Sequence, residues 1–256
     1  MSAARRGPAV ALWRLLRALA HVLRGLWIVR SEFGRLTPAQ CTLLVREWSR
    51  QMLAIMGVAL VVRGTPPARG PLLLVANHIS WLDILVLNAA QPARFVSKAD
   101  VKHWPVLGAL ITGAGTLYIE RASRRDAMRV VHQMAAALTA GGTLAVFPEG
   151  TTHDGHSLLP FHANLIQAAI STHAPVLPAA LQYRDGASGK RSDAPLFLGQ
   201  TTLLQSVWRT LRADGMQACV HFGEPQTADQ RDRRTWAADL QQAVAALLAS
   251  GAAAGQ

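Results

Sequence analysis

The amino-terminal part of the chain alternates leucine, valine, alanine and tryptophan with widely spaced arginines. Between Pro8 and Val29 the polar residues recur at spacings of three, four and three, as Arg14, Arg17, His21 and Arg24. These spacings place the four side chains on one helix face and leave the other face apolar. A second stretch, 37–58, has a charged middle followed by an uncharged run, so we expect two amphipathic helices forming a hairpin.

Beyond residue 58, short apolar runs alternate with longer stretches of helical period. The expected strands are 59–63, 72–76, 94–97, 116–119, 143–147, 176–181 and 218–222. The expected helices are 81–89, 105–112, 124–140, 163–172, 202–213 and 228–248, and 185–194 is expected to be a polar loop. This alternation predicts an α/β fold with a central, mostly parallel or mixed sheet flanked by helices. We therefore divide the chain into an amino-terminal helical segment, 1–57, and one α/β domain, 58–256.

Charge changes the interpretation of the amino-terminal segment. The net charge is +11, and residues 1–63 carry ten arginines against Glu32 and Glu47, so 10 − 2 gives +8 of that total. An excess of this size indicates an anionic partner, either nucleic acid or a membrane surface. Because these arginines lie among leucines and tryptophans, the pattern favours an anionic membrane and no nucleic acid. The alternative is that both helices simply pack on the α/β domain.

The first helix is not expected to cross the bilayer. Each of its three central arginines would cost about 2.5 kcal/mol or more at the bilayer centre. The same arginines interrupt what would be the apolar core of a signal peptide. The two cysteines, Cys41 and Cys219, form no multi-cysteine framework, which fits a reducing compartment. The expected location is peripheral, on the cytoplasmic face of the inner (plasma) membrane.

Candidate chemistry first appears where the predicted strand 72–76 ends, at the sequence Asn77-His78-Ile79-Ser80-Trp81-Leu82-Asp83. Ligands of α/β sheets collect beyond the carboxyl ends of strands. A histidine at this position can accept a hydroxyl proton, and the carboxylate of Asp83 can hold the other ring nitrogen. The alternative is a helix cap in which Ser80 and Asp83 form a capping box around an ordinary buried histidine.

A second cluster follows the predicted strand 143–147, with the sequence Phe147-Pro148-Glu149-Gly150-Thr151-Thr152. Gly150 permits close backbone approach, and consecutive amides can hold an anion or a developing oxyanion. Alone, this sequence is also typical of a tight turn. His153, Asp154 and His156 continue the segment, but they lack a distant third ligand, so no metal site is expected.

Together the two clusters resemble the motifs of the glycerolipid acyltransferase family, which includes the lysophosphatidic acid acyltransferases. Two further blocks, Gly115–Arg121 and Ala174–Pro178, also resemble that family, and the likeness extends over about residues 58–225. It implies that His78 and Asp83 are the catalytic dyad and that Arg121 binds phosphate. It also implies a basic residue at Lys98 and substrate contacts at Asn77, Phe147, Pro148, Glu149, Gly150 and Thr151.

Thr152 departs from the family pattern, since an arginine usually follows Phe-Pro-Glu-Gly-Thr. The continuation Thr-Thr-His-Asp-Gly-His and the following Leu-Pro-Phe resemble the branch that contains lyso-ornithine lipid acyltransferases. That lipid has an amino-acid head group and no phosphate. The resemblance therefore leaves two acceptors open, 1-acylglycerol-3-phosphate, which we expect first, and lyso-ornithine lipid.

The expected activity is transfer of a fatty acyl chain from an acyl thioester to the free hydroxyl of a membrane lysophospholipid. The thioester, on acyl carrier protein or coenzyme A, is a co-substrate, and no cofactor is expected. A Ser-His-Asp hydrolase fits less well because the chain has no Gly-x-Ser-x-Gly motif. The alternative of another class is a non-catalytic, lipid-binding membrane adaptor that uses the amino-terminal arginines.

Overall fold

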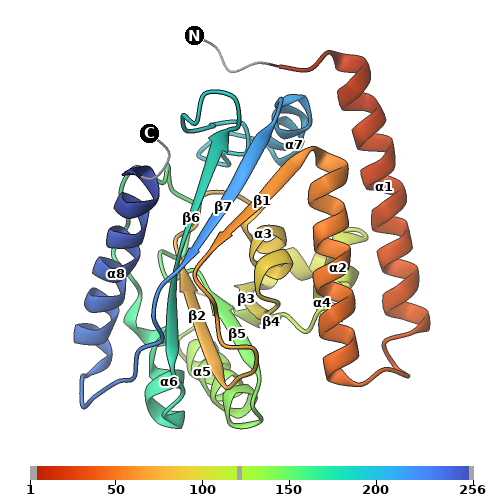
Figure 1. Ribbon diagram of the computed structural model, residues 1–256. Helices are drawn as coiled ribbons and strands as arrows, with labels where there is room; N and C mark the ends of the chain where they lie inside the picture. The colour runs from red at the N-terminus through yellow and green to blue at the C-terminus, as the bar shows by residue number, and fades with distance from the viewer. Residues whose placement is uncertain (1–4, 120–122, 254–256) are drawn as a thin grey trace.

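A seven-stranded sheet forms the centre of the molecule in the computed structural model, which describes residues 5–119 and 123–253 (Figure 1). The strands are β1 (Val58–Arg63), β2 (Leu72–Ala76), β3 (Arg94–Lys98), β4 (Leu117–Ile119), β5 (Thr143–Val146), β6 (Val176–Asp185) and β7 (Met216–Phe222). Their order is β1-β7-β6-β2-β5-β3-β4, and every neighbouring pair is parallel except β6 and β7. The predicted α/β fold with a mostly parallel sheet is confirmed.

Helices cover both faces of this sheet (Figure 1). They are α1 (Pro8–Ser31), α2 (Pro38–Met56), α3 (Asp83–Ala90), α4 (Leu107–Gly113), α5 (Arg124–Thr139), α6 (Gln167–Thr172), α7 (Leu203–Arg212) and α8 (Arg233–Ala253), with short 3-10 turns η1 (Ala99–His103) and η2 (Ala163–Leu165). On β2, Leu72, Leu74 and Ala76 join a core with α2, α3 and α7. Leu73 and Val75 join a second core with α5, α6 and α8. All five residues are buried, as expected of a central strand covered on both faces.

The observed elements depart from the predicted bounds in two places that have clear causes. β6 runs four residues beyond the expected end at 181, because Ala179–Asp185 pairs antiparallel with β7. α8 begins at Arg233 rather than at 228, because the Asp232 carboxylate accepts hydrogen bonds from the Arg234 and Thr235 amides and caps the helix there.

The two amino-terminal helices exist as expected and lie side by side (Figure 1). A reciprocal Thr37–Gln40 capping box starts α2, and Gly57, with φ of 78°, ends it. The last turns of α2 bury Met52, Leu53 and Met56 in the core that α2 shares with α3 and α7. The helical segment therefore packs on the α/β domain, while its membrane role stays a prediction.

The predicted polar face of α1 is partly packed against the rest of the protein, while Arg17 and Arg24 are exposed. His21 is buried and stacks on Trp48, and Arg14 donates to the carbonyls of Leu211 and Ala213. The spacing rule groups side chains on one face, but it does not tell which face packs, and hydrogen bonds make burial of these polar groups acceptable.

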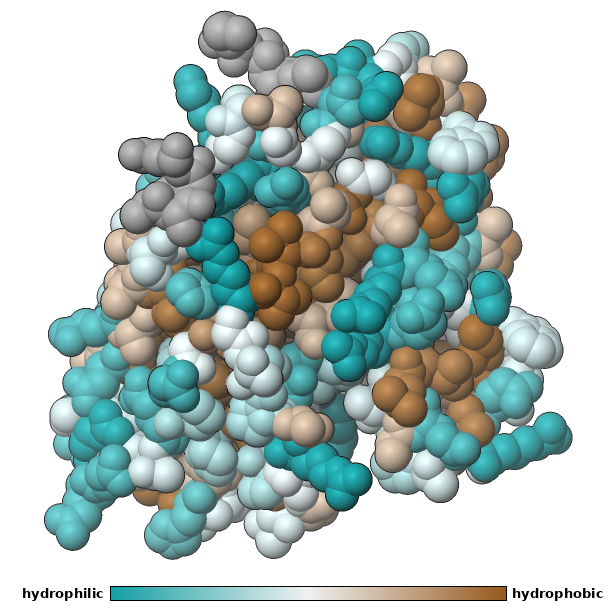
Figure 2. All heavy atoms as spheres, in the orientation of Figure 1, coloured by the Kyte–Doolittle hydropathy of each residue, from teal (hydrophilic) through white to brown (hydrophobic). Residues whose placement is uncertain are grey.

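The predicted apolar face of α1 is largely exposed. Six of its large side chains are 51–63% exposed: Leu12, Trp13, Leu16, Leu19, Leu23 and Trp27. In Figure 2 apolar side chains reach the surface along the edge of the molecule where α1 and α2 run. Among the described residues, no helix combines the length and the hydropathy needed to cross a membrane.

Candidate active site

The two sequence clusters meet at one edge of the sheet. β2 and β5 are neighbouring parallel strands, with Val75 opposite Val146, so their carboxyl ends lie together. The segment from Asn77 follows the first strand and the segment from Phe147 follows the second. Two hydrogen bonds join them, since the His153 amide donates to the His78 carbonyl over 2.8 Å and the His78 amide donates to the Glu149 carboxylate over 2.8 Å.

His78 and Asp83 form a close pair. Asp83 Oδ2 accepts the Nδ1–H of His78 over 2.7 Å and also accepts the amides of Ile79, at 2.6 Å, and Ser80, at 2.9 Å. The carboxyl group is fully buried at the start of α3. The alternative of a Ser80–Asp83 capping box is wrong, because Leu82 is the N-cap of α3 and makes no side-chain cap hydrogen bond. The Asp83 carboxylate instead orders the preceding turn and also holds the imidazole.

The orientation of the His78 ring suits a general base. With Nδ1 donating to Asp83, the neutral ring carries its free lone pair on Nε2. The ring stacks on Phe147 with centroids 4.0 Å apart and planes 7° apart, and the side chain keeps 19% of its surface exposed. His78 also lines the large cavity described below. The imidazole is thus fixed on two sides and accessible on the side where a hydroxyl could bind.

Glu149 connects the two clusters through both of its oxygens. Oε1 accepts the His78 amide, and Oε2 accepts the Leu159 amide over 2.9 Å. The residue is buried, and burial raises the pKa of Glu149 above its ordinary value, against the opposing effect of the two amides. Its carboxylate therefore holds the backbone around His78, and its expected contact with substrate stays a prediction.

Three other expected site residues are engaged within the protein. The amide group of Asn77 pairs with the backbone of Leu181 in both directions, at 3.1 Å and 2.7 Å. The carbonyl of Pro148 accepts the His162 amide, and the Gly150 amide donates to the Phe147 carbonyl over 3.0 Å. An oxyanion contact from this turn would therefore come from an amide other than that of Gly150.

The remaining expected residues either line the cavity or lie outside the described residues. Lys98 is exposed at the end of β3 and, like Gly150 and Thr151, borders the cavity. Arg121, the expected phosphate ligand, lies outside the described residues. In the part of the chain that the structure describes, no three histidine, cysteine or acidic side chains gather as metal ligands would.

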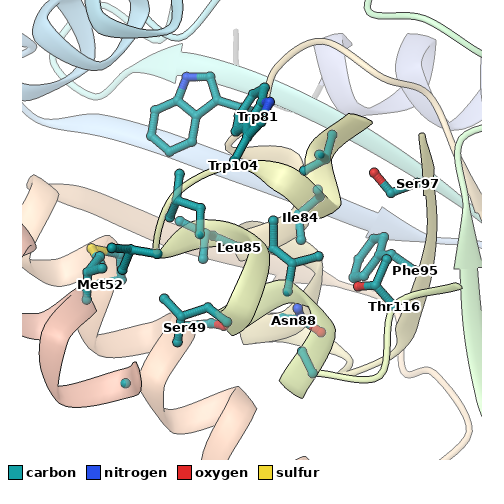
Figure 3. Close-up of a pocket in the computed structure, with 18 of the residues that line it drawn as sticks. Ser49, Met52, Trp81, Ile84, Leu85, Asn88, Phe95, Ser97, Trp104 and Thr116 are labelled. Atoms are coloured by element: carbon teal, nitrogen blue, oxygen red, sulfur yellow. The ribbon is translucent and has the colours of Figure 1, made fainter. Parts of the chain in front are cut away.

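An apolar cavity of about 1160 Å³ extends from His78 between the amino-terminal helices and the sheet. Side chains of α2, α3, β3 and the turn before α3 surround it, among them Met52, Trp81, Ile84, Leu85 and Phe95 (Figure 3). Residues of α1 and α4 complete its wall. A deep apolar space beside a single exposed imidazole is suited to a long hydrocarbon chain whose reactive end lies at His78.

Sequence reasoning missed Tyr183, whose hydroxyl donates to Asp83 Oδ1 over 2.6 Å. The residue lies on β6, two positions past the end that the apolar pattern predicted. It also missed that α1 and α2 form part of the cavity wall. Neither feature leaves a local signal, because both depend on contacts between segments far apart in the chain.

Comparison with known proteins agrees with this geometry. The profile of the family described as Acyltransferase matches residues 60–182. A lyso-ornithine lipid O-acyltransferase of Pseudomonas aeruginosa is 38% identical over 242 residues, which cover 91% of each chain. A 1-acyl-sn-glycerol-3-phosphate acyltransferase of Neisseria meningitidis is 36% identical and covers 81% of this chain and 82% of its own.

A solved structure supports the fold independently. The 1-acyl-sn-glycerophosphate (LPA) acyltransferase PlsC of Thermotoga maritima superposes with a TM-score of 0.60 at 19% identity. The match covers 91% of this chain and 97% of the other. At that identity the likeness is one of fold.

Proposed function

This chain belongs to the acyltransferase family, and from that membership we propose that it transfers a fatty acyl chain from an acyl thioester to the hydroxyl of a lysophospholipid. The observation that carries this proposal is the Asp83-held imidazole of His78 at the end of a large apolar cavity. An acyl thioester needs both parts, an apolar space for the chain and a base beside the carbonyl carbon.

The reaction is a direct transfer. The acceptor hydroxyl gives its proton to Nε2 of His78 while its oxygen attacks the thioester carbonyl carbon. The resulting tetrahedral oxyanion collapses, the carbon–sulfur bond breaks, and the thiolate takes the proton from the imidazolium. Asp83 stabilises the imidazolium between these two steps. These reaction steps require no covalent enzyme intermediate and no cofactor. The thiol carrier, acyl carrier protein or coenzyme A, leaves as product.

For the acceptor we propose 1-acylglycerol-3-phosphate, with lyso-ornithine lipid as a second candidate. The cationic Lys98 at the cavity rim favours an anionic head group. The second candidate is favoured by Thr152, which stands where the family usually has arginine and whose hydroxyl donates to the Phe197 carbonyl. The Pseudomonas relative carries the name of that activity.

We further propose that the enzyme works at the cytoplasmic face of the inner membrane as a peripheral protein. The apolar face of α1 is suited to the acyl boundary of a leaflet, and the exposed Arg17 and Arg24 beside it are suited to anionic head groups. The cavity, which α1 and α2 partly enclose, would then lie close to the lipid substrates.

A matrix of substrates tests the activity and the acceptor together. The purified protein is incubated with acyl carrier protein and coenzyme A thioesters against lysophosphatidic acid, lyso-ornithine lipid and lysophosphatidylcholine. We expect acyl transfer to one of the first two and loss of it in His78→Ala. Liposome binding by an unmutated protein that transfers no acyl group to any acceptor would support the adaptor alternative instead.

A further inference from the structure

Tyr183 contacts the catalytic pair from β6, which neighbours β2 on the side away from β5. We propose that Tyr183 is a positioning residue that fixes the Asp83 carboxylate, and through it the imidazole of His78. This inference rests on the proposed function of His78 as the base. Its direct support is the hydrogen bond of 2.6 Å from the phenol oxygen to Asp83 Oδ1, between two groups that are 2% and 0% exposed.

The four hydrogen bonds to Asp83 divide unevenly between its oxygens. Oδ2 accepts three donors, from His78, Ile79 and Ser80, all of which belong to the same short turn. Among the described residues, Tyr183 is the one donor to Oδ1. Bonds to Oδ2 alone fix the position of that oxygen but leave the carboxylate able to tilt about it. The phenol removes that freedom, so the plane of the carboxylate, and hence the direction of the Nδ1–H bond, is fixed.

The phenol is held as a donor. Burial, followed by the charge of Asp83 and the hydrogen bond to it, raises the pKa of Tyr183 well above its ordinary value. The hydroxyl therefore keeps its proton at physiological pH. A carboxylate can only accept, so the direction of this bond is fixed as well.

The position of Tyr183 in the sheet makes the contact rigid. Its neighbours on β6 pair with β7 on both sides, with Gln182 opposite Cys219 and Arg184 opposite Gln217. On the same strand, the backbone of Leu181 binds the side chain of Asn77. β6 thus holds the turn 77–83 at both of its ends, through Asn77 at the start and Asp83 at the close. The described lining of the cavity does not include Tyr183, so an effect on turnover has to pass through Asp83.

The test is Tyr183→Phe, which removes one oxygen atom and keeps the ring. We expect kcat to fall roughly ten- to a hundredfold, the range of one hydrogen bond to a charged group, with KM for both substrates nearly unchanged. Tyr118→Phe is the matched control, because it also removes a hydrogen-bonded phenol, here one bonded to Thr112, away from the dyad. Thermal melting of each variant fixes an assay temperature at which all are folded.

A double-mutant cycle separates positioning from a general structural role. In an Asp83→Asn background, Tyr183→Phe should lower the residual kcat by much less than in the wild type, because its route of action is already broken. Equal losses in both backgrounds, or a wild-type kcat for Tyr183→Phe, would overturn the inference. If the wild-type protein transfers no acyl group to any acceptor, the proposed function fails instead, so the two failures are distinct.

Discussion

At the scale of single residues, the site depends on side chains that serve the backbone and the reaction together. Asp83 orders the turn of Ile79 and Ser80 and also holds the imidazole, and Glu149 bridges the His78 amide to Leu159. Such double use explains why polar side chains this close to an apolar cavity are buried without leaving their oxygens unpaired. It also means that changes at these positions should affect both turnover and stability.

The dyad itself gives the first prediction. Because general base catalysis contributes roughly 10²–10⁴-fold, His78→Ala should lower kcat by about that factor, and Asp83→Asn should be severely impaired as well. The exposed His132 on α5 supplies the control, since His132→Ala removes a histidine far from the dyad. Near-normal turnover by His78→Ala, measured as acyl-chain incorporation into the acceptor, would rule out the dyad mechanism.

Glu149 gives a prediction about pH and stability. Its folded pKa is raised, chiefly by burial, so the folded protein holds this proton to higher pH than the unfolded chain does. The stability linked to this proton is complete below the ordinary carboxyl range and is lost as pH rises through the folded pKa. The wild-type free energy of unfolding minus that of Glu149→Gln should therefore decrease as pH rises from 4 to 7.

Chemical denaturation at a series of pH values measures that difference. Glu224→Gln is the control, because Glu224 is exposed in a loop. A difference between wild type and Glu149→Gln that stays constant or grows with pH would show that ionisation of Glu149 does not oppose folding.

Much of the site was predictable from residues close in sequence, and the rest was not. The pairing of His78 with Asp83 follows from their spacing at a strand end, and the meeting of both clusters follows from neighbouring parallel strands. Tyr183 could not be foreseen, because its contact with Asp83 depends on where β6 lies in the sheet. The roles of Asn77 and Glu149 as backbone partners likewise depend on contacts with Leu181 and Leu159.

At the scale of elements, α1 and α2 pack against each other where they form part of the cavity wall. His21 Nε2 lies 3.0 Å from the Trp48 carbonyl, while Trp48 Nε1 donates to the His21 carbonyl over 3.1 Å. Burial lowers the pKa of His21, which keeps the ring neutral at pH 7 and suited to stacking on the indole. The helical period predicted both helices and grouped His21 with the arginines, but it did not predict the packing of His21 on Trp48, because periodicity carries no information about which partner a face meets.

Gly25 is buried on α1 and packs tightly against Trp48 of α2, and it supplies the third prediction. A Cβ at this position would lie 2.6 Å from Trp48 Nε1 and 3.2 Å from Leu110. Gly25→Ala should therefore destabilise the fold by about 1–2 kcal/mol, since overpacking outweighs the gain in helix propensity. Gly34→Ala, where a Cβ meets nothing within 4 Å, should be neutral. Equal urea midpoints for both variants would contradict this packing.

The α1 wall of the cavity gives a prediction about chain length. Ala18 lines the cavity, whereas Ala20, two residues further along the same helix, is exposed. Ala18→Phe should fill part of the cavity and lower kcat/KM for long acyl donors more than for short ones. Ala20→Phe carries the same added volume on the other face and should leave the ratio of long to short donors unchanged. An unaltered ratio for Ala18→Phe would place the acyl chain elsewhere.

At the scale of the whole molecule, the exposed apolar face of α1 borders the cavity, because Leu19 and Leu23 belong to both. The exposed apolar residues from Leu12 to Trp27 lie within a stretch of sixteen residues, about 22 Å along the helix, and form a larger apolar patch than singly scattered surface residues would. Of the net charge of +11, +8 lies in residues 1–63, the part of the chain that contains α1. This arrangement leads to our proposal that the lipid surface meets the enzyme at α1.

Deletion of both helices would be a poor test of that proposal, because α2 contributes Met52, Leu53 and Met56 to the core. Point changes on the exposed face of α1 avoid this problem. Leu12→Glu with Leu16→Glu alters two side chains that are 51% and 58% exposed and that do not belong to the described lining of the cavity, and it adds two negative charges. In the proposed complex both leucines insert into the lipid. Losing even part of that burial should weaken binding to vesicles containing phosphatidylglycerol by roughly 3 kcal/mol, or about a hundredfold.

The same double variant should keep its turnover on a short-chain lysolipid that stays monomeric in solution, because neither the dyad nor the fold is touched. Leu204→Glu, at a leucine 71% exposed on α7, controls for the loss of an exposed leucine elsewhere. Vesicle sedimentation measures binding, and the salt dependence of that binding reports the share carried by the arginines. If the double variant sediments with vesicles as the wild type does, α1 is not the membrane contact. If it loses activity on both substrates alike, the exposed face of α1 acts through the fold and not through the lipid surface.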